Sequence, residues 1–163
     1  MTEANIAVAD RIERVDLDPL TIPEGPPDQR HDRLVAIFDL VEENVFRVKG
    51  REAGPYWLLV SSQETKLTFE GFSSRTGERV CNIVVSTTPL RSLLRVYAMV
   101  CQSYYSAIRN ASPRQIEQID RERTAIHTEG ANLILERFGE EVDIDLATAR
   151  RIFTLVTTLY RTT

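Results

Sequence analysis

The sequence predicts an α+β fold in which a small antiparallel sheet is covered by helices. Three observations predict this class. Runs of β-branched and aromatic residues between positions 56 and 86 are separated by short turns, as in an antiparallel meander. Apolar residues recur at helical spacing once before this block and in three long stretches after it. Strands that gather before helices, rather than alternating with them, indicate α+β rather than α/β.

The chain has 163 residues, 42% of them hydrophobic and 27% charged, which is ordinary for a soluble globular protein. A chain of this length buries a core without disulfides or metals. We expect an N-terminal segment, 1–27, with an edge strand and a proline-rich linker, followed by a single α+β domain, 28–163.

The first expected element is an edge strand within residues 12–22, where apolar and polar residues partly alternate. Pro23-Glu-Gly-Pro-Pro27 then breaks any regular pattern. Asp28 is a candidate N-cap for a helix over about 28–44. Its expected apolar stripe consists of Leu34, Ile37, Phe38, Val41 and Val45.

The β block gives three strands, over about 56–61, 67–72 and 80–86, joined by the turn-rich links 62–65 and 74–77. A further strand over 45–51 would make four. The short links favour antiparallel pairing of consecutive strands.

Three helices complete the fold and pack on the sheet. Thr88-Pro89 and Ser112-Pro113 each place a capping residue before a proline, which is typical of a helix start. The first of these helices has the broadest apolar face, so we expect it at the centre of the core. The second runs to about Phe138 and ends at Gly139. Asp145 caps the last helix, whose expected inward residues are Leu146, Ala149, Ile152, Phe153, Val156, Leu159 and Tyr160.

The middle of the chain is basic. Residues 46–115 hold 10 bases and 4 acids, against a net charge of −4 for the whole chain. On the helix that begins near Thr88, a polar face opposite the apolar one carries Arg91, Arg95, Gln102, Ser106 and Arg109. Arginine without local acids suits carboxylate or phosphate recognition. The alternative is a solvated face, or one paired with Asp39, Glu42 and Glu43 of the first helix.

The helix over 113–138 carries a second candidate site. Asp120, Arg123 and His127 lie three, four and seven residues apart beside its apolar stripe, so they could form one hydrogen-bonded row. Histidine works as an acid or base near neutral pH. Glu129 and Gly130 follow, and a glycine inside a helix often marks a close contact. These four ionisable residues are candidates for catalysis, and a buried structural network is the alternative.

The absence of known motifs argues against several classes of protein. Phosphate loops, nucleophile elbows and dinucleotide fingerprints are absent, and we expect no cofactor. His31, Cys81, Cys101 and His127 match no zinc spacing, so we expect no metal. We expect the two cysteines to be free thiols in a cytoplasmic protein. No apolar run approaches a membrane span, and we expect no membrane partner.

Many short stretches of the chain share the pattern of one protein family. These stretches are His31-Asp-Arg33, Ala36-Ile-Phe-Asp-Leu40, Glu43-Asn44, Gly54-Pro-Tyr56, Cys101, Ser103-Tyr-Tyr105, Ala107-Ile-Arg109, Ile119-Asp120, His127, Glu129-Gly130, Thr148-Ala-Arg-Arg151 and Phe153-Thr-Leu155. Through them the chain resembles an uncharacterised bacterial protein family of the UPF ("uncharacterised protein family") series. The chain departs from the pattern with Arg121 and Glu122, and with Thr124 where the resemblance leads us to expect arginine. The resemblance implies a small cytoplasmic bacterial protein and transfers no reaction and no catalytic residue.

Three hypotheses for function stay open at this point. We favour a non-enzymatic binding or regulatory module that recognises an acidic protein or nucleic acid through the arginine face of Arg91, Arg95, Gln102 and Arg109. The alternative is a small-anion binder or enzyme built on the row over 120–129. The third is a structural subunit, marked by an exposed apolar patch. An oligomer is compatible with the sequence, with Leu155 and Tyr160 as a candidate contact.

Overall fold

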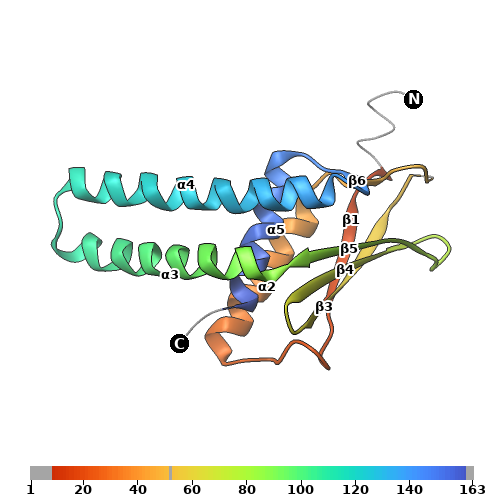
Figure 1. Ribbon diagram of the computed structural model, residues 1–163, viewed down its shortest axis with the longest axis horizontal. Helices are drawn as coiled ribbons and strands as arrows, with labels where there is room; N and C mark the ends of the chain where they lie inside the picture. The colour runs from red at the N-terminus through yellow and green to blue at the C-terminus, as the bar shows by residue number, and fades with distance from the viewer. Residues whose placement is uncertain (1–8, 52, 161–163) are drawn as a thin grey trace.

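The computed structural model describes residues 9–51 and 53–160, and confirms the α+β class (Figure 1). Residues 1–8 of the predicted N-terminal segment 1–27 lie outside the described residues. The elements in chain order are β1 (Ile12–Leu17), α2 (Pro27–Glu42), β2 (Arg47–Val48), β3 (Tyr56–Gln63), β4 (Lys66–Ser73), β5 (Arg79–Ser86), α3 (Thr87–Asn110), α4 (Pro113–Phe138), β6 (Val142–Asp143) and α5 (Leu146–Leu159).

The main sheet has the strand order β1-β3-β4-β5. β3, β4 and β5 form the predicted antiparallel meander, and β1 is the predicted edge strand. β1 pairs in parallel with β3, so the sheet is mixed. The strand expected over 45–51 does not join this sheet. Only Arg47–Val48 is extended, and it pairs with β6 in a separate two-stranded ribbon.

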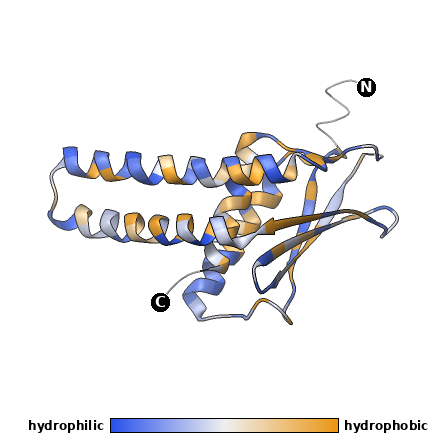
Figure 2. Ribbon diagram, in the orientation of Figure 1, coloured by the Kyte–Doolittle hydropathy of each residue, from blue (hydrophilic) through white to orange (hydrophobic). Residues whose placement is uncertain are grey.

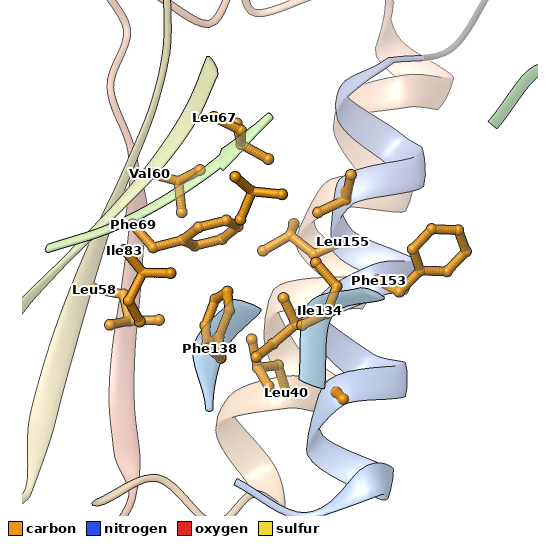
Figure 3. Close-up of a cluster of buried hydrophobic side chains, with 14 of the residues drawn as sticks. Leu40, Leu58, Val60, Leu67, Phe69, Ile83, Ile134, Phe138, Phe153 and Leu155 are labelled. Atoms are coloured by element: carbon orange, nitrogen blue, oxygen red, sulfur yellow. The ribbon is translucent and has the colours of Figure 1, made fainter. Parts of the chain in front are cut away.

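The core lies between one face of the sheet and the helices. Alternate residues of β3 and β4 point to this face because side chains alternate along a strand. Leu58, Val60 and Phe69 of the sheet face Phe138 of α4 and Leu155 of α5 (Figure 3). The Phe69 and Phe138 rings meet edge to face, with centroids 5.0 Å apart. On the other face, Trp57 and Phe72 stack and are half-buried.

α2 differs from its prediction in two ways. Pro26 occupies the N-cap position and no side chain caps the helix, so Asp28 lies in the first turn. Leu34 and Phe38 of the expected stripe are 67% and 65% exposed. The helix instead buries a side that includes Arg33, whose guanidinium is bonded to backbone carbonyls and is therefore tolerated inside.

The expectation that the helix beginning near Thr88 is central to the core is wrong. α3 starts at Thr87 with Ser86 at the N-cap position, two residues before the predicted first helical residue, Pro89, and most of it is exposed. Apart from Ala107, its buried residues lie in its first two turns, where the helix leaves β5. Its broad apolar face covers α4, and the two helices project from the sheet as a long hairpin (Figure 1).

The last two helices begin as predicted. Ser112 and Gln115 form a capping box at the start of α4, and the Asp145 side chain accepts from the Thr148 amide at the start of α5. Two details are corrected. Leu146 is 39% exposed, whereas Thr148 and Ala149 in the same turn of α5 are fully buried. Leu155 is buried in the core, so it does not supply the contact between copies suggested by its spacing.

Candidate functional site: the α3–α4 hairpin

The candidate residues from both sequence patterns lie on one structure, the α3–α4 hairpin. Two antiparallel helices of 24 and 26 residues are joined by Ala111 and Ser112. At its base, α4 packs against α5 through Gly130, where a Cβ atom would lie 2.2 Å from the Phe153 ring. Phe153 therefore occupies the space that a side chain at position 130 would need.

The arginine face is exposed as a unit. Arg91, Arg95, Gln102 and Arg109 are all exposed on α3. Within the described residues, none of its three arginines forms an ion pair; Arg91 donates to the Glu64 carbonyl oxygen at 3.2 Å. The alternative was that these arginines pair with acidic residues of the first helix. Glu43, one of those acids, instead forms an ion pair with Arg151 of α5, with 3.3 Å between the charged atoms.

The polar row of α4 is divided between two sets of partners. Asp120 and Arg123 form an ion pair, and the Arg123 guanidinium lies 4.3 Å from the ring centroid of Tyr104 on α3. His127 bonds instead to Thr154 of α5, with 2.8 Å between Nε2 and Oγ1. The arrangement cross-links α4 to both neighbouring helices.

The Thr154 hydroxyl fixes the proton on His127. Thr154 Oγ1 donates its hydrogen to the Arg150 carbonyl oxygen at 3.0 Å. A hydroxyl has one hydrogen, so Oγ1 accepts from His127 Nε2–H, and the neutral ring keeps Nδ1 as an acceptor. Burial lowers the pKa of His127 below its ordinary 6.5, and the positive charges of Arg150 and Arg123 lower that pKa further.

This shift predicts an acid-sensitive stability. Because the folded chain binds a proton at His127 less readily than the unfolded chain does, the stabilisation is complete above pH 6.5 and is lost as the pH falls below it. We expect the free energy of unfolding to decrease from about pH 7.5 to about pH 5.5. His127→Gln should reduce this slope and His31→Gln, on an exposed surface, should preserve it. Urea titrations at each pH measure both, and an unchanged slope in His127→Gln would contradict the assignment.

Glu129 is exposed on α4, beyond the end of the polar row. Four surface hollows within the described part of the chain are lined by residues other than Asp120, Arg123 and His127. Thr154 lines one of about 330 Å³, whose other residues are Ala36, Asp39, Glu42, Glu43 and Arg151.

The remaining observations concern possible metal ligands, cysteines and long apolar helices in the described ranges 9–51 and 53–160. There, three or more His, Cys, Asp or Glu side chains do not gather as metal ligands. Cys81 and Cys101 are free, as predicted. Among the described helices, none combines the length and apolar character needed to cross a bilayer.

Two features were missed by sequence reasoning. Tyr104 of α3 contacts Arg123, and Thr154 of α5 bonds to His127. The positions of Tyr104 and Thr154 in the sequence give no signal of these contacts. Asp10 is 1% exposed and its carboxylate oxygens have no hydrogen-bond partner in the described structure.

The sheet, its helical cover and the projecting hairpin define a small α+β protein whose candidate residues lie on a helical arm. The chain belongs to a bacterial family described as "Uncharacterised protein family (UPF0262)", which matches residues 9–162. A UPF0262 protein of Hyphomonas neptunium is 45% identical over 152 residues, 93% of each chain. One from Methylobacterium radiotolerans is 45% identical over 150 residues, 92% of each chain. One from Rhizobium meliloti is 46% identical over 140 residues, 86% of this chain and 88% of that one. No solved structure matches this chain.

Proposed function

We propose that the protein is a non-enzymatic binding module whose arginine face, Arg91, Arg95, Gln102 and Arg109, recognises an acidic protein surface. The observation that carries the proposal is that these arginines are exposed on a projecting helix with no carboxylate partner among the described residues. Guanidinium groups held on a rigid helix bind carboxylates in pairs of directed hydrogen bonds.

The dimensions of the face favour a protein partner over nucleic acid. Arg91 and Arg109 are separated by 18 residues, or about 27 Å along the helix axis. Three arginines on a chain of net charge −4 supply few phosphate contacts, whereas non-specific nucleic-acid affinity depends on the sum of many. An acidic helix or strand of similar length fits this spacing better.

The alternative, a small-anion or acid/base site at Asp120, Arg123, His127 and Glu129, has weaker support. Asp120 already occupies Arg123, and the hollow beside Thr154 is lined by three carboxylates that would repel an anion. The lowered pKa of His127 favours a neutral ring, which attracts an anion less than a charged one does. The binding module is therefore the better-supported function.

The test is quantitative capture from a native bacterial extract with Arg91→Ala, Arg95→Ala and Arg109→Ala combined. We expect the triple variant to fold normally and to lose partner binding by at least about 100-fold, because each charge-assisted contact contributes about 1.5–3 kcal/mol. A matched control removes three exposed arginines elsewhere, Arg75, Arg114 and Arg121, and should bind like the wild type. Binding should survive nuclease and weaken with salt. Equal capture by the triple variant would refute the proposal, and loss of binding after nuclease would assign the face to nucleic acid instead.

A further inference from the structure

A hollow of about 700 Å³ lies between the end of β1, the linker over residues 18–26 and the first turns of α2. We call it the linker hollow. Figure 1 shows the linker passing from the end of β1 to the start of α2. Figure 2 shows hydrophobic positions along this linker. Small-molecule sites in proteins measure about 300–1,000 Å³, so the linker hollow has the size of a ligand site.

The walls of the linker hollow are mainly apolar. On α2, Leu34 is 67% exposed and Ile37 is half-buried, and both belong to the stripe that the sequence places toward the core. In the structure this part of the stripe borders the linker hollow instead. The apolar wall consists of Leu17, Pro19, Ile22, Pro27, Leu34 and Ile37.

Hydrogen bonds hold the linker away from α2, so the linker hollow is preformed. The Asp18 carboxylate accepts from the Thr21 hydroxyl at 3.2 Å, and Thr21 Oγ1 accepts from the Ser62 amide of β3 at 3.0 Å. Nearer to α2, Arg33 Nη1 donates to two carbonyl oxygens of the linker at 2.7 and 3.0 Å. The linker is thus fixed to the sheet at one end and to α2 at the other, and the space between them stays open.

Charged side chains gather where the linker meets α2. Arg30, His31 and Arg33 line the linker hollow from α2, and Glu24 lines it from the linker. Arg30 Nη1 donates to Glu24 Oε1 at 2.7 Å, and its Nε and Nη2 have no hydrogen-bond partner within the described part of the chain. Two arginines against one glutamate leave this lining with a net positive charge, which favours an anion over a cation.

We propose that the linker hollow binds a small amphipathic carboxylate, with its apolar body against Leu34 and Ile22 and its carboxylate at Arg30. Nε and Nη2 form one edge of a guanidinium, and such an edge binds a carboxylate through two parallel hydrogen bonds. A single negative charge fits better than a phosphate dianion, because the Glu24 carboxylate is held beside Arg30 and repels additional negative charge.

This ligand site is separate from the proposed function. The linker hollow is formed by β1, the linker and α2, whereas the arginine face lies on α3, and the two share no residue. Substitutions in the linker hollow should therefore leave capture of an acidic protein unchanged. The combined change of Arg91, Arg95 and Arg109 to alanine should leave carboxylate binding unchanged, so the two proposals fail independently.

Titration of the full chain with octanoate, followed by proton–nitrogen correlation NMR, tests the proposal. We expect saturable shifts of backbone amides between residues 17 and 37, with a dissociation constant of about 1 mM or below, as is typical of a ligand with few atoms. Octanamide has the same length without the charge, so it should bind at least about 10-fold more weakly.

Three substitutions locate the site. Leu34→Asn removes part of the apolar wall and should weaken octanoate binding by at least about 10-fold. Phe38→Asn is the matched control, because Phe38 is 65% exposed on the same helix and does not line the linker hollow, and it should bind octanoate like the wild type. Arg30→Met should weaken octanoate binding by at least about 10-fold and leave octanamide binding unchanged.

Circular dichroism first establishes that each variant is folded. If Leu34→Asn does not fold, the positions of the shifted amides in the wild type decide whether the ligand occupies the linker hollow. The proposal is overturned if the wild type shows no saturable shifts up to about 5 mM octanoate. Equal binding of octanoate by the wild type and Leu34→Asn overturns it too, because the ligand then occupies another surface. Equal affinity for octanoate and octanamide would show that the site does not select an anion, and would overturn it as well.

Discussion

Gly130→Ala should destabilise the protein by about 2 kcal/mol, as is typical of overpacking in a core, even though alanine improves helix propensity by about 1 kcal/mol. The alanine Cβ would lie 2.2 Å from the Phe153 ring, and that ring is fully buried. Phe153 has little room to withdraw, because it also packs on His127 and Tyr97 with centroid distances of 5.2 and 6.1 Å. The free energy of unfolding in urea measures the change.

A double-mutant cycle with Phe153→Leu isolates this contact. Leucine removes the ring carbons that the new methyl group at position 130 would meet, so Gly130→Ala should cost at least about 1 kcal/mol less in the Phe153→Leu background than in the wild type. Ser103→Ala, at an exposed helical position, gives a smaller helix-propensity gain than Gly→Ala does, without the contact. Additive costs of the two substitutions at positions 130 and 153 would show that the close approach is not what destabilises Gly130→Ala.

Arg33→Met should destabilise the protein by about 3 kcal/mol, because buried acceptors that lose a charged donor cost about 1–3 kcal/mol each. Arg33 is 7% exposed. Its Nη1 donates to the Pro23 and Glu24 carbonyl oxygens at 2.7 and 3.0 Å, and its Nε donates to the Thr158 carbonyl oxygen at 3.3 Å. The side chain thus joins α2 both to the linker that precedes it and to the end of α5.

Arg30→Met is the matched control on the same helix. Arg30 pairs with Glu24 at 2.7 Å, but both side chains are largely exposed, so the loss should be below about 1 kcal/mol. Urea denaturation of both variants gives the comparison. Equal costs for the two substitutions would mean that the bonds of Arg33 to the carbonyls add nothing beyond a surface ion pair.

Local signals explain which parts of the fold were predictable. Ser112, Pro113 and Gly139 mark the ends of α4 because capping and helix termination depend on a few adjacent residues. The position of α3 was not predictable in this way. A broad apolar face at 3.6-residue spacing shows that something covers the helix, and it does not show whether the cover is a core or one neighbouring helix. The parallel pairing of β1 with β3 likewise depends on contacts between segments far apart in the sequence.

The same distinction applies to the candidate site. The exposed side of α3 follows from helical periodicity, so Arg91, Arg95 and Arg109 could be placed together from sequence. The bond between His127 and Thr154 joins residues 27 positions apart, and only the packing of α4 on α5 brings them together. Arg33 was expected only as part of a family resemblance, because nothing local distinguishes a buried arginine from a solvated one.

The arginine face of α3 is, on our proposal, the binding surface of this protein. Hydrogen–deuterium exchange of the chain, alone and bound to the acidic protein that it captures, tests this claim most directly. We predict slower exchange of backbone amides in α3 between Arg91 and Arg109, with the part of α4 around Glu129 and the hollow beside Thr154 unchanged. Protection confined to α4 and α5 around His127, with α3 unchanged, would contradict the claim and would move the binding site to the polar row.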